Sequence, residues 1–253
     1  MRVDLNADAG ESFGAWTMGE DDALVREVTS INIACGFHAG DPTIMRRTIR
    51  LASAAGVAVG AHPGFADLQG FGRRTIRVSS SELEDLVLYQ VAAIAGVARA
   101  EAVSLTHVKP HGALYNQAAA DPSLAEAIVR AIVAFDRSLV LVGLANSALI
   151  AAARNAGLRA ASEAFADRGY CPDGTLAHRG TPGAVISDPS EAASRALRFV
   201  REQRVTAVDG SELSVRADTL CIHGDTPGAA GIARAIRQTL QQAGVSVRSF
   251  SAP

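Results

Sequence analysis

The sequence predicts an α/β fold in which repeated strand–helix units build one barrel-like domain over residues 1–253. Short runs rich in Val, Ile and Leu alternate with longer Ala-rich amphipathic stretches, which is the rhythm of successive βα units. No linker interrupts this series of roughly seven or eight units. Aromatic residues make up only 5% of the chain, so the core must come from small and aliphatic side chains, as in folds that pack helices on parallel strands. We therefore expect a barrel rather than a doubly wound sheet.

The predicted strands are the short aliphatic runs of this series. They lie near residues 2–7, 30–35, 57–61, 104–109, 139–143, 158–163, 218–223 and 245–250. Between about 205 and 216, the pair Asp209-Gly210 is flanked by β-prone residues, which is typical of a hairpin. We expect this hairpin to be an insertion in the βα series.

Helix starts are marked by a capping side chain just before a proline, because proline fits the first helical position. The four such pairs are Asp41-Pro42, Asp121-Pro122, Asp188-Pro189 and Thr226-Pro227. Ser79 and Asp188 are each followed by Glu three residues later, which is the spacing of a capping box. We expect helices to begin at these points.

Charge and cysteine content exclude several classes of function. The chain has 24 Lys and Arg against 26 Asp and Glu, so it has no basic excess for nucleic acid or an anionic membrane. Its three cysteines are widely spaced and form no Cys-x-x-Cys motif, which suits a reducing compartment. Acidic residues interrupt the opening MRVDLNADAGE where an export signal needs an apolar run, and the apolar region 139–153 is too short and interrupted to span a bilayer. We expect a cytoplasmic protein with no nucleic-acid or membrane partner.

Polar residues alternate with apolar ones in several predicted strands, which indicates that one strand face looks into a site or a polar lumen. Asp4, Asn6 and Asp8 share one face of the first strand. Lys109 and Glu163 lie at the carboxyl ends of later strands. Five of the six histidines lie at or just past such ends, namely His38, His62, His107, His111 and His223. Because barrels and open α/β sheets place their sites there, we expect one cleft that performs acid/base catalysis, binds a metal, or does both.

The ligand of this cleft is left open by the residue pattern. Imidazole and carboxylate are suitable metal ligands, but the spacing of His107 and His111 gives little support, because Pro110 removes the helical geometry that makes such spacing useful. No G-x-x-x-x-G-K-[ST] loop occurs, so the sequence excludes a P-loop ATPase core.

Two loops carry arginines that suit an anion. Arg73 and Arg74 follow glycines in the loop 70–74, which either clamps an anionic group or is an ordinary solvated loop. Arg168 lies in the long Gly-rich segment 163–183, which has the character of a lid.

Seven motifs occur in order along nearly the whole chain, from Asp4 to about Asp225: DLNADAGE, NIACGFHAGDP, GAHPGF, FGRR, HVKPHGALYNQ, EAFADRGY and CIHGD. Together they resemble the LamB/YcsF family, with Ala9, where leucine is common, as a minor departure. The resemblance implies an irregular seven-stranded (β/α) TIM-like barrel, similar to the glycoside hydrolase/deacetylase superfamily. It also implies a bacterial three-subunit enzyme that opens 5-oxo-L-proline (pyroglutamate) to L-glutamate while hydrolysing ATP to ADP and phosphate.

The implied cofactors and partners follow from that activity. ATP would be a co-substrate with Mg²⁺ in the assembled enzyme, and a further divalent metal is possible in the barrel cleft. The partners would be 5-oxoproline and the two other subunits of the enzyme (B and C).

The implied reaction suggests catalytic roles for four residues of the cleft. We expect Asp8 or Glu163 to act as general base for water. Lys109 and His111 would stabilise charge on the activated amide.

Substrate-binding and metal-binding roles are expected for the remaining candidates. Arg73 or Arg74 would hold the substrate carboxylate. Further substrate-binding candidates are Asn6, His107 and Arg168, and the metal candidates are Asp8, His38, His62 and His223. The three histidines of the metal set are alternatively acid/base partners.

Two other functions remain open from the sequence. A stand-alone metal-dependent hydrolase, such as a deacetylase, is favoured by fold analogy alone. A non-catalytic component that binds the substrate while its partners do the chemistry is the third interpretation.

Overall fold

Seven parallel strands close into a barrel in the computed structural model, which describes residues 1–226 and 228–250. In ring order they are β1 (Arg2–Ala9), β2 (Ser30–Ala34), β3 (Ala58–His62), β4 (Leu105–Val108), β5 (Val140–Leu144), β6 (Ala160–Phe165) and β9 (Thr219–Ile222). The ring closes because β9 also pairs with β1, with Asp4 opposite Thr219. The predicted α/β barrel is therefore confirmed.

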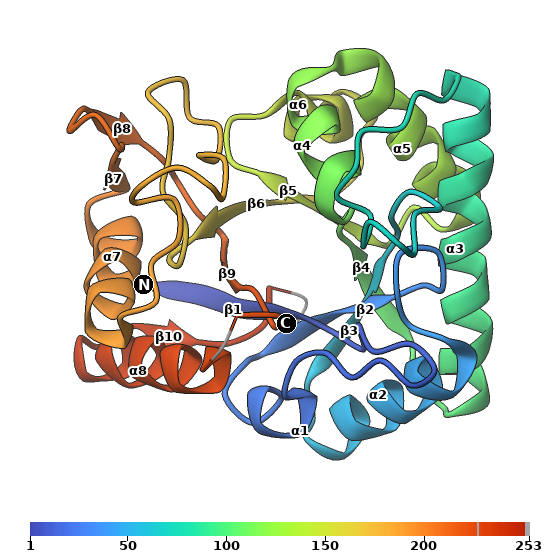
Figure 1. Ribbon diagram of the computed structural model, residues 1–253, viewed down its shortest axis with the longest axis horizontal. Helices are drawn as coiled ribbons and strands as arrows, with labels where there is room; N and C mark the ends of the chain where they lie inside the picture. Colours follow the sequence, from blue (N-terminus) through green and yellow to red (C-terminus); the bar gives the residue numbers. More distant parts are fainter. Residues whose placement is uncertain (227, 251–253) are drawn as a thin grey trace.

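The helices lie outside the strand ring (Figure 1). They are α1 (Asp21–Leu24), α2 (Pro42–Ala54), α3 (Ser80–Ala100), α4 (Gly112–Ala120), α5 (Pro122–Phe135), α6 (Ala148–Asn155), α7 (Pro189–Arg201) and α8 (Ala229–Gln242). Asp41, Asp121 and Asp188 cap α2, α5 and α7 as predicted, each accepting hydrogen bonds from two backbone N–H groups of the first turn. Ser79 and Glu82 form the capping box of α3.

The predicted start of the last helix is wrong. α8 begins at Ala229, and its N-cap is Gly228, whose backbone has a positive φ of 78°. Thr226 therefore does not cap this helix, and Pro227 lies outside the described residues. A left-handed backbone at the N-cap is accessible to glycine at no steric cost, which explains why the helix begins after it.

Two short additions complete the strand set. β7 (Arg204–Thr206) and β8 (Glu212–Ser214) pair antiparallel in the segment where the sequence predicts a hairpin. The strand predicted at 245–250 is shorter than expected: β10 covers only Ser246–Val247. β10 pairs with Arg2 and Val3, the first two residues of β1. The residues of β1 that pair within the ring come after these two.

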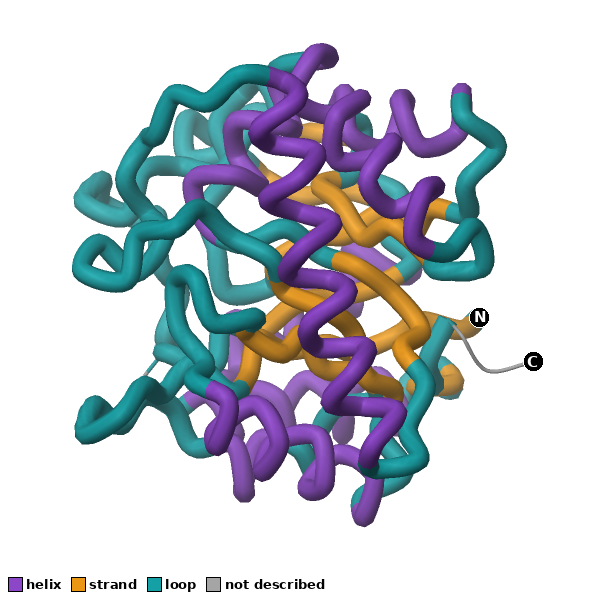
Figure 2. Tube along the Cα trace, turned by 90° about the vertical axis from the view of Figure 1, so that its right-hand side faces the viewer, coloured by secondary structure: helices purple, strands orange, loops and turns teal. Residues whose placement is uncertain are grey.

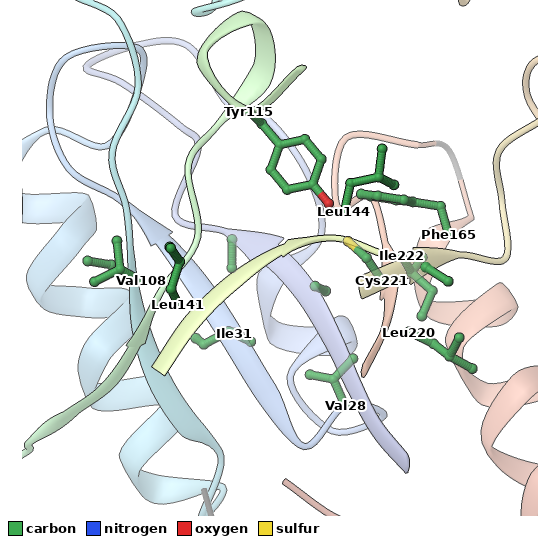
Figure 3. Packing of buried hydrophobic residues seen from close by; sticks show 14 of the residues in the cluster. Val28, Ile31, Val108, Tyr115, Leu141, Leu144, Phe165, Leu220, Cys221 and Ile222 are labelled. Carbon is green, nitrogen blue, oxygen red and sulfur yellow. The ribbon is translucent and has the colours of Figure 1, made fainter. Parts of the chain in front are cut away.

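The strand alternation read from the sequence separates an apolar outer face from a polar lumen. Leu5 and Ala7 of β1 are buried in the hydrophobic layer between strands and helices. Figure 3 shows Ile31 of β2 and Leu220 of β9 in the same layer. Asp4, Asn6 and Asp8 are equally buried, but their hydrogen bonds join them to polar side chains of other strands. The polar face of β1 therefore lines the barrel interior.

Long loops gather at the end of the barrel away from the N-terminus, where the parallel strands have their carboxyl ends (Figure 2). The longest connection runs from β6 to α7 and contains only isolated bridges, such as the one between Arg168 and Val185. Within the described part of the chain, no helix has the length and apolar character needed to cross a bilayer.

Candidate active site

A cavity of about 200 Å³ opens at the carboxyl ends of the strands. The predicted site residues that line it are Asp8, His62, Arg73, Lys109, His111, Arg168 and His223. Tyr115, Phe165, His178 and Arg179 line it as well, and the sequence did not single them out as site residues. Its volume is below the roughly 300–1,000 Å³ of sites for drug-sized ligands, so the cavity suits a small substrate.

Lys109 lies at the floor of this cavity between two buried carboxylates. Its Nζ is 2.9 Å from Oδ1 of Asp8, 3.0 Å from Oε1 of Glu163 and 2.9 Å from Sγ of Cys221. Burial opposes the charge, yet the carboxylates outweigh it and hold the pKa of Lys109 well above its usual value. The ammonium is therefore charged, and it places a fixed positive charge beside the cavity.

The two carboxylates differ in what they can do. Both oxygens of Glu163 are occupied, Oε1 by Lys109 and Asn6 and Oε2 by the Tyr115 hydroxyl at 2.7 Å, and the side chain does not line the cavity. Asp8 lines the cavity, and its Oδ2 lies 3.4 Å from Nε2 of His62. Burial raises the pKa of Asp8, but His62 and Lys109 outweigh burial and hold it well below the usual value. Of the two predicted general bases, only Asp8 is placed to reach a substrate.

Asn6 and His107 lie beneath the cavity rather than in its wall. Asn32, whose place on the polar face of the second strand follows from the alternation but which was given no role, donates to Oδ1 of Asn6 at 2.8 Å and to Oδ1 of Asp8 at 2.9 Å. His107 Nε2 lies 2.9 Å from Oδ1 of Asn32, and burial lowers the pKa of His107 to about 3. The substrate contacts predicted for Asn6 and His107 are therefore not supported, because this lower layer of side chains holds Asp8 in place from inside the lumen.

A buried cluster of Glu11, His38, His62 and His111 lies beside the floor. One ligand atom from each side chain lies within 4.8 Å of all the others, so this cluster could bind a divalent metal. Burial lowers the pKa of His38 and His111 well below the usual value and raises that of Glu11 well above it.

The predicted metal set of Asp8, His38, His62 and His223 differs from this cluster. His38 and His62 belong to the cluster, but Glu11 and His111 complete it in place of Asp8 and His223. Glu11 was missed because it follows the predicted strand by several residues, although it lies in the first family motif, DLNADAGE.

His223 lies outside the cluster of Glu11, His38, His62 and His111 and contacts a carboxylate instead. Its Nδ1 lies 2.9 Å from Oδ2 of Asp167, and its ring stacks on Phe165 with centroids 5.2 Å apart. Burial works against the charge of Asp167, but His223 overcomes it and lowers the pKa of Asp167. Because Nδ1 is occupied, Nε2 is the ring nitrogen that remains for a ligand. Asp167 lies in the motif EAFADRGY, which was the available signal for it.

Three arginines from two loops surround the mouth of the cavity. Arg73 Nη2 lies 2.6 Å from Asp225, and Arg179 lies 3.8 Å from the same carboxylate. Arg168 donates to the backbone carbonyls of Ala184 and Ala177. Burial and the neighbouring arginines lower the pKa of Arg168. One carboxylate shared by two guanidiniums leaves positive charge for an anionic ligand.

Arg74 does not reach the cavity. Its guanidinium pairs with the buried carboxylate of Asp67, which also accepts from the backbone N–H of Gly70. A Cβ at Gly70 would lie 2.2 Å from Asp67 Oδ2, so only glycine lets this turn close around the carboxylate. Of the two predicted anion-binding arginines, the structure therefore brings only Arg73 to the site.

Comparisons with known proteins cover almost the whole chain. The LamB/YcsF family model matches residues 3–253. The chain is 56% identical over 248 residues to the A subunit of 5-oxoprolinase from Methylococcus capsulatus, covering 98% of this chain and 95% of that protein. The crystal structure of a lactam utilization protein from Thermus thermophilus superposes with a TM-score of 0.93 at 54% identity and covers 99% of this chain and 100% of that one. A family 4 carbohydrate esterase from Streptomyces lividans has a TM-score of 0.52 at 11% identity, covers 97% of this chain and 91% of that one, and shares the fold alone.

Proposed function

This chain belongs to the LamB/YcsF family, and on that premise we propose that it is the A subunit of a 5-oxoprolinase, an enzyme that opens the lactam ring of 5-oxo-L-proline to give L-glutamate. The full-length similarity to proteins of that name supports the proposal. The observation that carries it is the small cavity that joins a buried lysine–carboxylate floor to an arginine-rich mouth. Such a cavity suits a small ring with one carboxylate.

ATP with Mg²⁺ is the co-substrate of the assembled enzyme in this proposal, and the nucleotide binds to the two other subunits. A lactam is resonance-stabilised and its five-membered ring recloses readily, so complete hydrolysis calls for activation. In this proposal the γ-phosphoryl group of ATP is transferred to the lactam oxygen with release of ADP, and phosphate leaves after water has attacked that carbon. The cavity of about 200 Å³ and the absence of a P-loop motif from the sequence support placing nucleotide binding outside this chain. The expected cytoplasmic location belongs to the same proposal.

The substrate carboxylate binds at the mouth, where Arg73, Arg168 and Arg179 supply positive charge. This contact leaves the lactam carbonyl directed toward the floor. There the Lys109 ammonium stabilises negative charge that develops on the carbonyl oxygen.

Proton transfers in the hydrolysis are assigned to two groups that line the cavity. Asp8 takes a proton from the attacking water as the new C–O bond forms. His223, oriented by Asp167, gives a proton to the ring nitrogen as the C–N bond breaks. The product is the open amino acid, with one carboxylate more than the substrate.

A stand-alone metal-dependent hydrolase is the second candidate. The specific observation in its favour is the buried glutamate–histidine cluster beside the floor, which offers metal ligands. This candidate needs neither ATP nor other subunits, so the two functions predict different requirements.

One reconstitution experiment separates the candidates. Glutamate and ADP are measured from 5-oxoproline with this chain alone, with this chain plus the two other subunits, and with those two subunits only. We expect both products only from the complete set. Glutamate formation by the two other subunits without this chain would show that this chain has no catalytic role. Turnover by this chain alone, without ATP, would favour the stand-alone hydrolase.

A further inference from the structure

Four side chains without a role in the proposed 5-oxoprolinase steps converge from four successive βα units. Glu11 follows β1, His38 follows β2, His62 ends β3 and His111 follows β4. All four are buried, and His38 is fully so. Bringing a carboxylate and three imidazoles together without solvent is unfavourable unless something satisfies their polar atoms.

Two of the imidazoles face each other through ring nitrogens that both carry lone pairs when the rings are neutral. Nδ1 of His62 lies 2.7 Å from the backbone oxygen of Lys109, and Nε2 of His111 lies 2.8 Å from the backbone oxygen of Phe71. A carbonyl oxygen only accepts, so each of these nitrogens donates. The remaining nitrogens, Nε2 of His62 and Nδ1 of His111, lie 3.1 Å apart. Two lone pairs at this distance repel unless a proton or a cation lies between them.

The other two members have polar atoms without a partner. Among the described residues, no hydrogen-bond partner is found for three buried atoms: the two ring nitrogens of His38 and Oε1 of Glu11. Oε1 of Glu11 lies 3.8 Å from Nε2 of His38 and 3.5 Å from Nδ1 of His111. These distances are too long for hydrogen bonds. They are close to the separation of about 3.4 Å between ligand atoms held tetrahedrally at roughly 2.1 Å from one metal ion.

Two glycines make room for the imidazoles. A Cβ at Gly64 would lie 2.7 Å from Nδ1 of His38. A Cβ at Gly72 would lie 2.8 Å from both His38 and His111. The His38 and His111 rings stack with centroids 3.8 Å apart at an angle of 4°, so one ring must turn about its side-chain torsions for both to direct a nitrogen at one ion. The backbone around the cluster thus lacks side chains where they would displace the rings.

We propose that Glu11, His38, His62 and His111 bind one divalent transition metal ion of the zinc type. Three imidazole nitrogens and one carboxylate oxygen suit Zn²⁺ or Co²⁺, whereas Mg²⁺ and Ca²⁺ prefer oxygen ligands. The hydrogen bonds from His62 and His111 to backbone carbonyls are the outer contacts that orient metal-binding imidazoles. This ion is therefore distinct from the Mg²⁺ that accompanies ATP.

The site lies in the wall of the proposed substrate cavity, because His62 and His111 line it. When bound, a metal of this kind polarises a water or carbonyl oxygen. The inference goes beyond the proposed function, since binding can be measured on this chain alone, without ATP or other subunits.

Metal content of the purified chain tests the site. The chain, without a polyhistidine tag, is stripped with a chelator, incubated separately with Zn²⁺, Co²⁺ and Mg²⁺, desalted and analysed by elemental mass spectrometry. We expect about one Zn²⁺ or Co²⁺ per chain and no retained Mg²⁺, with a visible absorption band for Co²⁺. Wild-type protein that retains neither Zn²⁺ nor Co²⁺ would overturn the proposal.

Variants locate the ion. Glu11→Gln and His38→Ala are expected to lower the bound Co²⁺ at least about tenfold. Glu126→Gln is the matched control for Glu11→Gln, because Glu126 is exposed on α5 and lies outside the cluster. Circular dichroism shows whether each variant folds. If His38→Ala does not fold, the nearly isosteric Glu11→Gln variant alone tests the site. Equal Co²⁺ binding by a folded Glu11→Gln variant and the wild type would also overturn the proposal.

The outcome is independent of the proposed 5-oxoprolinase activity. Glutamate formation with ATP and Mg²⁺ by a complex free of Zn²⁺ and Co²⁺ would exclude a catalytic role for this ion but leave the function standing. If the chain binds Co²⁺ as described but forms no glutamate with its partners, the proposed function is contradicted and the proposed metal site is supported.

Discussion

Nζ of Lys109 and Oδ1 of Asp8 lie 2.9 Å apart in the barrel lumen, although 101 positions separate them in the chain. Lys109 follows β4 and Asp8 ends the polar face of β1. Both side chains are buried, so neither charge is stable there without the other. This pair, together with Glu163, fixes the charge at the cavity floor.

Replacing Lys109 by methionine is expected to lower the free energy of unfolding by about 3–5 kcal/mol, because Asp8 and Glu163 lose their buried counter-charge. Urea unfolding measures this effect. The triple variant Asp8→Asn, Lys109→Met, Glu163→Gln removes all three charges and should recover most of the stability while glutamate formation stays low. A single Lys109→Met variant as stable as the wild type would show that the three groups are not coupled.

Arg73→Met is expected to raise KM for 5-oxoproline by about 10- to 100-fold with a smaller change in kcat, because a charge-assisted contact to the substrate carboxylate is lost. Arg74→Met is the matched comparison, and we expect its KM to be unchanged, since Arg74 pairs with Asp67. Initial rates of the reconstituted enzyme measure both. Equal KM effects in the two variants would contradict the placement of the substrate carboxylate.

Asp167→Asn is expected to lower kcat by at least about 100-fold with little change in KM, because an amide does not hold His223 in the orientation and protonation state that a carboxylate does. The high-pH limb of the pH profile of kcat should move to lower pH as well, because a general acid acts in its protonated form and Asp167 stabilises that form; a purely structural effect would not produce this shift. A variant with wild-type kcat and an unchanged pH profile would exclude His223 from proton transfer.

Ionisation of the buried Asp4 carboxyl should lower the stability of the barrel as the pH rises. Burial raises the pKa of Asp4 to about 6, against the opposing hydrogen bonds from Thr219, Thr29 and Ser30. A carboxyl whose folded pKa lies above the unfolded value stabilises the fold below the unfolded pKa and loses that contribution as pH rises through the folded pKa. The difference in unfolding free energy between wild type and Asp4→Asn should therefore fall by about 2 kcal/mol between about pH 4 and pH 7.

Denaturant unfolding across this range measures the difference. Asp85→Asn is the control, because Asp85 is exposed on the outside of the barrel in α3. Its stability should follow the wild type at every pH. A constant difference between wild type and Asp4→Asn would show that the buried carboxyl does not titrate in this range.

The barrel and the position of its site could be predicted because strand periodicity is a local property. Alternation in β1 sets Asp8 toward the lumen, and the parallel order of the strands brings Lys109 and Glu163 to the same end. The positions of these residues, which lie within or directly after a strand, could therefore be predicted without knowing the loop conformations.

The rest of the site depends on loop conformation, which periodicity does not determine. Arg73 and Arg74 are adjacent in sequence, and only the turn at Gly70 decides which one meets Asp67. Likewise, His223 pairs with Asp167 because the loop after β6 brings that carboxylate beside it. Glu11 reaches the histidines through a loop after β1, so its place could not be inferred from strand register.

Glutamate formation by the reconstituted enzyme carrying Asp8→Asn tests the central claim most directly, because Asp8 is the carboxylate at the floor that faces the cavity. With assembly verified by size-exclusion chromatography, we expect ATP-dependent turnover of 5-oxoproline to fall by at least about 100-fold. The exposed Asp173→Asn variant should retain wild-type turnover. Full turnover by an assembled Asp8→Asn enzyme would contradict the assignment of Asp8 as the general base.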